Sequence, residues 1–397
     1  MFGLAHLVAP LSQEDFLRNF WGTRAVFIQG TEEKFKDLFG WSEVNSYLNN
    51  ARDGYPGFRL LHEKTPLSPQ AFQSLDTWIK KGATLVINNV QQIDEVIRQF
   101  NESLGADLNT AINTNCYVSC PARQGFDNHF DEHCVFVVQI EGRKAWKVFP
   151  PTVKYPLHAQ GMTQKGAPPT ADPYIECVMS PGDVLFIPRG HWHYAIAETP
   201  SVHLTVGPAS RSATEFLAWL NAQLMNGDEF FRRDFPVAGA TALGGTIDGA
   251  FEAHVDEFRR RLSAIIQGDA LTESVIRYCM SSNPVRRNRP LPQDWMLEEK
   301  ITPETEFKFP ATQKALIRYD SETRSAAIHV RGHLLQLNAM PEVLLAPMFE
   351  RTGVILTGTR LLEHCPELGW DKLKAILLTL YSAGVLELSE SDATVWA

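Results

Sequence analysis

The sequence has few cysteines and no long apolar run, and both absences narrow the class of protein. Its six cysteines in 397 residues include no Cys-x-x-Cys pair and do not reach the density of a disulfide scaffold. No apolar stretch is long enough to span a bilayer. The first residues, MFGLAHLVAP, lack the basic region and apolar run of a secretory signal. We therefore expect a cytoplasmic, reduced protein with no membrane partner.

Basic residues are also scarce. The chain has 37 Lys and Arg against 46 Asp and Glu, a net charge of −9, and residues 301–397 hold nine basic against twelve acidic residues. Proteins that bind nucleic acid normally show a basic surplus. Residues 361–365, 370–383 and 384–388 resemble a helix–turn–helix–wing arrangement, but direct nucleic-acid binding is not expected. A structural or protein-docking role fits this region better.

The composition is that of an ordinary globular protein, with 44% hydrophobic and 21% charged residues and enough length for two or three domains. Residues 1–112 alternate helical and strand signals. Short strands separated by Gly/Pro turns follow, which predicts a barrel or double-sheet jelly roll. We expect these strands near 114–119, 134–140, 144–149, 174–179, 184–188 and 201–206. The continuous apolar run Val135–Val138 suits a strand buried on both faces. Helical patterns occupy 212–224 and 249–266, and 281–292 has the composition of a linker.

The candidate metal ligands lie in two short segments of the sequence. His129-Phe130-Asp131 places an imidazole and a carboxylate two residues apart, and residues i and i+2 of a strand point to the same face. A second apolar strand, Val184–Pro188, leads to His191-Trp192-His193. Two histidines and one carboxylate on one side of a cation leave the opposite positions open, as in the facial triad of non-haem Fe(II) oxygenases.

The residues alone leave alternatives open. A His-x-Asp pair is more often a surface hydrogen bond than a metal site, and a cupin fold with another metal or none is the next alternative. Either His191 or His193 could be the second imidazole. His133 shares the parity of His129 and Asp131, but three same-face ligands from one strand rarely converge, so it is not expected to bind metal.

Lys144 follows the hairpin after the metal stretch. A dicarboxylic co-substrate bound to iron would carry its far carboxylate inward, where a buried cation must neutralise it. Lys144 stands next to Ala145 and Trp146, which favours such a role. Equally, it could follow Arg143 into solvent at the turn, and the residues do not decide between the two.

These motifs resemble the JmjC-domain 2-oxoglutarate oxygenases, most closely their ribosomal-oxygenase branch. The resemblance rests on QGFDNHFDEHCVFVVQIEGRKAW from Gln124 to Trp146, on PGDVLFIPRGHWH ending at His193, and on SVHLT, residues 201–205. It implies that His129, Asp131 and His193 hold Fe(II), with His193 preferred over His191. It also implies that 2-oxoglutarate and O2 are co-substrates. Four further residues are implied to bind the co-substrate: Lys144, Asn115, Tyr117 and Thr205.

The resemblance further implies an α+β fold with three parts. These are a double-stranded β-helix (jelly-roll or cupin) JmjC barrel at 1–208, a helical dimerisation region at 209–285 and a winged-helix-like C-terminal domain at 300–397. We therefore expect a homodimeric 2-oxoglutarate-dependent dioxygenase that hydroxylates a protein side chain, of a ribosomal protein in the first instance. The alternatives are a hydroxylase of a peptide or small molecule, a demethylase of methyl-lysine, and a non-catalytic JmjC scaffold that binds a partner.

Overall fold

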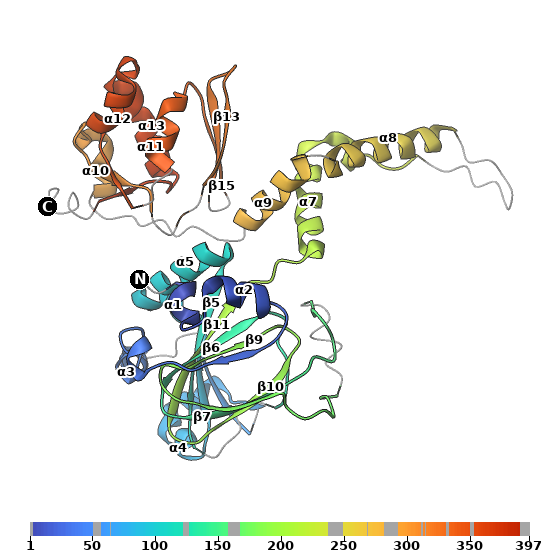
Figure 1. The fold of residues 1–397 in the computed structure, drawn as a ribbon, viewed down its shortest axis with the longest axis vertical. Helices are drawn as coiled ribbons and strands as arrows, with labels where there is room; N and C mark the ends of the chain where they lie inside the picture. The colour runs from blue at the N-terminus through green and yellow to red at the C-terminus, as the bar shows by residue number, and fades with distance from the viewer. Residues whose placement is uncertain are drawn as a thin grey trace. The chain divides into compact units, whose positions relative to one another are not determined.

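The computed structural model describes most of the chain, and Figure 1 shows its elements. The described residues are 3–50, 57–63, 65–121, 127–157, 167–236, 249–267, 269–281, 293–310, 313, 315–330, 333–349 and 353–389. By its internal contacts the chain divides into two units, Met1–Ser210 and Arg211–Ala397. None of the described helices is both long and apolar enough to cross a membrane. The predicted linker at 281–292 lies outside the described residues except for Ser281.

Two antiparallel sheets form the centre of the first unit. The larger sheet has the strand order β1-β9-β6-β11-β5-β4-β2-β3, and the smaller one has the order β10-β7-β8. The larger sheet comprises β1 Val26–Ile28, β2 Phe58–His62, β3 Thr65–Pro66, β4 Thr84–Ile87, β5 Ile112–Ser119, β6 Val135–Glu141, β9 Val184–Ile187 and β11 Ser201–Pro208. The smaller sheet comprises β7 Lys144–Phe149, β8 Ile175–Met179 and β10 Trp192–Ala197.

Strand β6 belongs to two hydrophobic cores at once. Phe136 and Val138 join the large core that includes the helices, whereas Val135 and Val137 join a smaller core with Trp146 and residues of both sheets. Alternate side chains of a strand point to opposite faces, so a strand that is covered on both sides needs a continuous apolar run. The prediction that Val135–Val138 is buried on both faces is confirmed.

Helices cover the outer face of the larger sheet. Residues of α1 (Leu4–Val8), α2 (Gln13–Asn19) and α5 (Glu95–Leu108) belong to the large core, and Figure 1 shows these helices beside β5 and β11. Helix α5 begins at a cap in which the Asp94 carboxylate accepts the Ile97 N–H at 2.7 Å. The remaining helical segments of this unit are η1 Glu32–Phe35, α3 Trp41–Asn50, η2 Pro69–Ser74, α4 Leu75–Lys80 and η3 Val90–Gln92.

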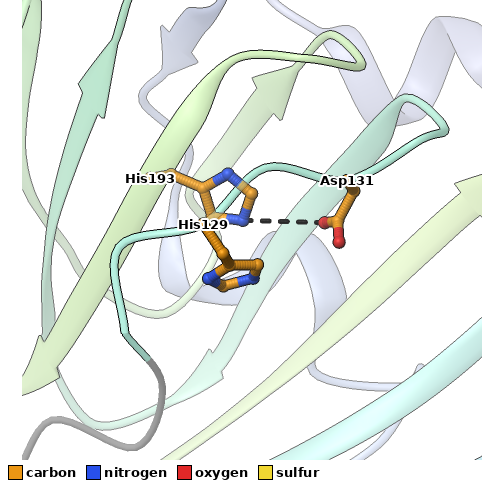
Figure 2. Close-up of side chains that lie close together, drawn as sticks. All are labelled: His129, Asp131 and His193. Atoms are coloured by element: carbon orange, nitrogen blue, oxygen red, sulfur yellow. Dashed lines mark ion pairs between the residues drawn. The ribbon is translucent and has the colours of Figure 1, made fainter. Parts of the chain in front are cut away.

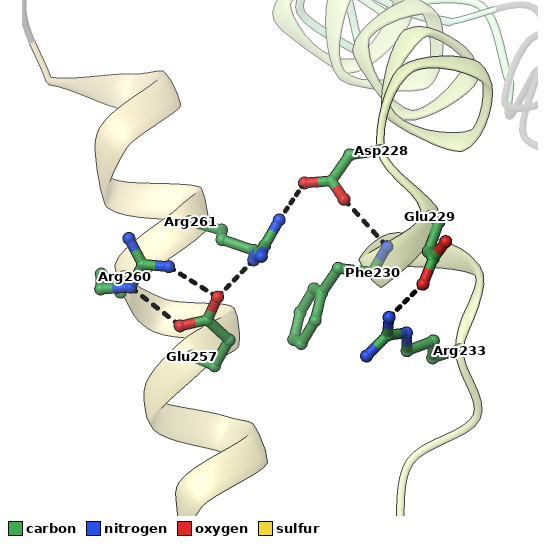
Figure 3. A network of polar contacts seen from close by, with 7 residues as sticks. All are labelled: Asp228, Glu229, Phe230, Arg233, Glu257, Arg260 and Arg261. Carbon is green, nitrogen blue, oxygen red and sulfur yellow. Dashed lines mark hydrogen bonds and ion pairs between the residues drawn. The ribbon is translucent and has the colours of Figure 1, made fainter.

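The second unit begins with helices, α7 (Ala213–Gly227), η4 (Glu229–Arg232), α8 (Gly249–Ile266) and α9 (Asp269–Ser281). Ser212 and Glu215 form a capping box at the start of α7. Figure 3 shows how Arg261 of α8 reaches both Glu257 of its own helix and Asp228 at the end of α7. The Asp228 carboxylate also accepts the Phe230 N–H at 2.9 Å, so one side chain caps η4 and holds α8 against it.

The rest of the second unit has its own apolar core, formed by helices and two three-stranded sheets. The sheet orders are β16-β12-β17 and β13-β14-β15. The strands are β12 Phe307–Lys308, β13 Ala315–Asp320, β14 Ser325–Val330, β15 His333–Leu337, β16 Ile355–Leu356 and β17 Glu387–Leu388. The helical segments are α10 Gln293–Lys300, η5 Glu342–Leu344, α11 Leu345–Phe349, α12 Gly358–His364, η6 Pro366–Leu368 and α13 Trp370–Ser382.

Candidate metal centre

Side chains of one parity from five strands line a single cavity between the two sheets. In the antiparallel register, His203 of β11 stands opposite Tyr117 of β5, and Ala195 of β10 stands opposite Trp146 of β7. Because the side-chain period of a strand is two, the neighbours at i±2 on each strand face the same cavity. Those that line it are Asn115, Tyr117 and Ser119 on β5, Val135 and Val137 on β6, Lys144 and Trp146 on β7, His193 and Ala195 on β10, and His203 and Thr205 on β11. Outside this pattern, Thr84 of β4 and Tyr194 of β10 line the cavity as well.

Three of the cavity's side chains form a compact donor group. One ligand atom from each of His129, Asp131 and His193 lies within 4.8 Å of the other two, and it is the only such group of three or more His, Cys, Asp or Glu among the described residues. His193 Nε2 lies 3.6 Å from Asp131 Oδ2. Figure 2 shows His129 and Asp131, from one segment, and His193, from β10, close together. His193 is buried, while His129 and Asp131 are half-buried.

Backbone pairing brings the two histidines together. His129 and His193 form an isolated antiparallel bridge, with N–O distances of 3.2 and 2.7 Å in the two directions. The Gly190 N–H also donates to the Asp131 carbonyl at 2.9 Å. The expectation that His129 and Asp131 share a regular strand is wrong, because β6 begins only at Val135. The i, i+2 spacing still presents both side chains to one point.

Hydrogen bonds from the backbone fix which nitrogen of each histidine is available. His129 Nδ1 lies 2.7 Å from the Asp127 carbonyl, and His193 Nδ1 lies 3.1 Å from the His191 carbonyl. A carbonyl only accepts, so each Nδ1 carries a proton, and Nε2 is the nitrogen that can bind a metal. Burial and the neighbouring His129 lower the pKa of His193 to about 4, so its ring is neutral at pH 7. Two imidazole nitrogens and a carboxylate are a donor set that fits Fe(II).

The other two histidines of this stretch have different surroundings. His191 Nδ1 lies 2.6 Å from the Tyr174 hydroxyl, which accepts the Ala25 N–H, and burial lowers the pKa of His191 to about 4. His191 is thus part of a hydrogen-bonded network outside the donor group. His133 lines the cavity but is exposed and does not belong to the donor group either.

Lys144 is buried, with 7% of its surface exposed, so the structure excludes the solvent-facing alternative. Its ammonium donates to Ser119 Oγ at 2.9 Å, lies 3.5 Å from His203 Nδ1 and stands 5.9 Å from the Trp146 ring centre. No carboxylate pairs with it among the described residues. Burial therefore lowers the pKa of Lys144 to about 7. A buried cation whose neighbours are all neutral is a site for an anion.

The remaining predicted residues also line the cavity. The side-chain oxygen Oδ1 of Asn115 accepts the Asn89 backbone N–H at 3.0 Å, which fixes that side chain. Tyr117 and Thr205 share a side-chain hydrogen bond, and burial together with the Asp131 charge raises the pKa of Tyr117 to about 12. The phenol is therefore a neutral group at pH 7.

Sequence reasoning gave no role to Ser119 or His203, although both contact Lys144. Strand alternation could have found them, because Ser119 follows Tyr117 by two residues and His203 precedes Thr205 by two.

Comparison with known proteins identifies related sequences and a related fold. Residues 85–216 match the family model for a JmjC domain. The "Bifunctional lysine-specific demethylase and histidyl-hydroxylase NO66" of Drosophila persimilis is 28% identical over 221 residues, which cover 51% of this chain and 31% of the relative. Human "Ribosomal oxygenase 1" is 28% identical over 223 residues, which cover 52% of this chain and 34% of that relative. The matched region thus spans about a third of these relatives.

Solved structures resemble nearly the whole chain. Escherichia coli ycfD has a TM-score of 0.63 at 17% identity, with 96% of this chain and 98% of that chain covered. A structure of the same ribosomal oxygenase in complex with cobalt and 2-oxoglutarate has a TM-score of 0.63 at 16% identity. This match covers 98% of this chain and 100% of that chain. At this identity the likeness establishes a shared fold.

Proposed function

We propose that this chain, which carries a JmjC domain with a cupin-like fold, is an Fe(II)- and 2-oxoglutarate-dependent protein hydroxylase. Its similarity to ribosomal oxygenases supports this proposal. The observation that carries the proposal is the set of side chains that line one cavity. It holds a two-histidine, one-carboxylate donor group together with a buried ammonium that pairs with no carboxylate in the described part of the chain. The first suits the metal, and the second suits the far carboxylate of a 2-oxo dicarboxylic acid.

His129, Asp131 and His193 would hold the metal through the two Nε2 atoms and the carboxylate. The backbone carbonyls of Asp127 and His191 keep both Nδ1 protons in place, so the ligand atoms stay available without reorientation. The open side of this donor group is where a 2-oxo acid and dioxygen fit. When bound, Fe(II) with these co-substrates supplies the oxidising chemistry, in which decarboxylation of the oxo acid is coupled to insertion of oxygen into a C–H bond.

Lys144 and the apolar walls would bind the rest of the co-substrate. The Lys144 ammonium neutralises the far carboxylate, and Ser119 orients that ammonium. Trp146 connects the two ends of the site, since its ring centre lies 6.1 Å from that of His193 and 5.9 Å from Lys144 Nζ. Val135, Val137 and Ala195 line the cavity and exclude water from the carbon chain. Asn115, Tyr117 and Thr205 provide neutral hydrogen-bonding groups.

The proposed substrate is a protein side chain, with a ribosomal protein as the first candidate. The support comes from the relatives, two of which bear the names "Ribosomal oxygenase" and "histidyl-hydroxylase". The name of the first relative also includes "lysine-specific demethylase", which requires a methyl-lysine substrate and the same co-substrates. Among the cavity residues, His133 is exposed and provides a polar group that a substrate side chain can contact.

We also propose that the second unit serves assembly and docking in a cytoplasmic homodimer. Exposed apolar residues on its helices support a dimer through α7 and α8, notably Leu217 at 60% and Ile266 at 49% exposure. The order α11, β16, α12, α13, β17 supports a winged-helix-like domain in 300–397, after a helical region in 209–285. Light scattering of Leu217→Glu tests the dimer, which should fall to half the mass of the wild type.

The decisive assay is succinate formation from 2-oxoglutarate with Fe(II), comparing the wild type with His129→Ala. His364→Ala, an exposed histidine on α12, is the matched control. We expect His129→Ala to abolish succinate formation and His364→Ala to leave it intact. Equal succinate output from the wild type and His129→Ala, with candidate substrates present, would favour a non-catalytic scaffold. Mass spectrometry of ribosomal proteins from a deletion strain, seeking the loss of one oxygen atom's mass, tests the substrate.

A further inference from the structure

His203 of β11 is a buried histidine with no role in the donor group, yet it lines the cavity. Its ring is held on two sides. Tyr117 stacks on it at 5.0 Å between ring centres and 12° between planes, and Trp146 meets it edge-on at 5.5 Å and 89°. A side chain clamped this way has a fixed orientation, so its nitrogens present hydrogen-bonding groups at defined places.

The contact with Lys144 fixes the protonation of this ring. Lys144 Nζ lies 3.5 Å from His203 Nδ1, and an ammonium can only donate. When Lys144 is charged, His203 therefore accepts at Nδ1 and carries its proton on Nε2, as a neutral ring. Burial and the nearby Lys144 charge both lower the pKa of His203, which keeps that neutral form populated.

The donors of Lys144 can now be counted. An ammonium has three N–H groups. One goes to Ser119 Oγ at 2.9 Å and one is directed at His203 Nδ1, while the third has no partner among the described residues. Two neutral acceptors on different strands thus hold the head of a flexible side chain and leave one donor for a ligand.

We propose that His203 is a positioning residue for the co-substrate, which holds the Lys144 ammonium so that its remaining N–H meets the far carboxylate of the 2-oxo acid. The inference rests on the proposed function and deepens it, because it assigns the binding of that carboxylate to a Lys144–Ser119–His203 group rather than to Lys144 and Ser119 alone. The competing explanation is that His203 only fills space between Tyr117 and Trp146.

Two substitutions separate these explanations because they remove opposite features. His203→Phe keeps an aromatic ring between Tyr117 and Trp146 but removes the acceptor. His203→Asn keeps an acceptor near the position of Nδ1 but removes the ring. If His203 positions Lys144, the Phe variant binds 2-oxoglutarate poorly and the Asn variant binds it well. If His203 only packs, the order is reversed.

The measurement is titration calorimetry of the full chain loaded with Mn(II) without oxygen, so that binding is read without turnover. We expect His203→Phe to weaken 2-oxoglutarate binding roughly tenfold, the loss of one hydrogen bond to a charged group, with His203→Asn within about threefold of the wild type. 2-Oxopentanoate, which lacks the far carboxylate, should bind wild type and His203→Phe alike. In turnover, His203→Phe should raise KM for 2-oxoglutarate and leave kcat nearly unchanged.

The outcomes are distinguishable. Wild-type affinity in His203→Phe, or equal weakening of both oxo acids, overturns the positioning role. If the Phe variant does not fold, His203→Asn still decides, since impaired 2-oxoglutarate binding in that variant supports packing alone and overturns the proposal. A wild-type protein that binds Mn(II) but no 2-oxoglutarate contradicts the proposed function itself, and with it this inference.

Discussion

Replacing Lys144 by Met should make the metal-free protein more stable while it abolishes 2-oxoglutarate binding. Met keeps most of the side-chain volume and removes the charge. Burial lowers the pKa of Lys144 from 10.5 to about 7. At about 1.4 kcal/mol per pKa unit, keeping Lys144 charged in the folded protein costs about 5 kcal/mol. At pH 7 half of the folded molecules carry a neutral Lys144, so the loss of folding stability is about 4 kcal/mol. Losing the Ser119 hydrogen bond offsets about 1 kcal/mol of the gain.

The sign of the pH dependence follows from the same shift. Between pH 7 and 10.5 the unfolded chain holds a proton on Lys144 that the folded chain has released, so the stability of the wild type rises with pH in that window. The Met variant has no such group. The free energy of unfolding of Lys144→Met should therefore exceed that of the wild type by about 3 kcal/mol at pH 7 and by about 1 kcal/mol at pH 9.

Thermal unfolding after chelation of metal measures this difference. At roughly 2–4 °C per kcal/mol for a unit of this size, Lys144→Met should melt about 6–12 °C above the wild type at pH 7. The control is Lys147→Met on the same strand, whose side chain pairs with Glu176 and is 38% exposed, and it should change little. A Lys144→Met protein that melts at or below the wild-type temperature, or whose advantage does not shrink at pH 9, would refute the reasoning.

Three further predictions address the site and the second unit. His193→Ala should lose Mn(II) binding by calorimetry, whereas His191→Phe should keep it, and equal loss in both would contradict the assignment of His193. The affinity for 2-oxoglutarate should fall roughly tenfold per pH unit above about pH 7, because Lys144 loses its proton in the ligand-free protein; a flat profile from pH 6 to 9 would argue against a charged Lys144 as the binding group. Asp228→Asn should lower the melting temperature of the second unit, since it weakens the Arg261 contact; an unchanged melting curve would show that the contact adds no stability.

The sequence predicts four of the five strands named above as lining the cavity, β5, β6, β7 and β11, because each has a strong local pattern. The predicted strand 144–149 coincides with β7, and 134–140 differs from β6 by one residue at each end. The strand β10, which carries His193, was missed. Its sequence, WHYAIA, has neither a continuous apolar run nor clear alternation, and it forms a strand through pairing with β7. The β13–β15 sheet was missed as well.

The burial of Lys144 could have been argued further from the sequence. Lys144 has the same strand parity as Trp146 and Val148, whereas Lys147 has the opposite parity. If one face of β7 is buried, parity places Lys144 on it, and only the lysine of the other face remains in solvent. What the sequence does not show is that β11 crosses beside β5 and brings His203 next to Lys144, since that depends on long-range strand order.

The polar inner surface of this cavity is not something that the fold needs. Elsewhere the inner faces of the same strands carry Val135, Val137 and Val148, which form the smaller core and satisfy the packing between the sheets. A Lys, a neutral His and a Ser in the same layer lower stability, because each desolvated polar group must find a partner and the ammonium finds only neutral ones. Buried groups that reduce stability persist where a ligand completes them. Lys144 and the His129, Asp131 and His193 group line the same cavity, so the anionic co-substrate of the proposed function would contact both.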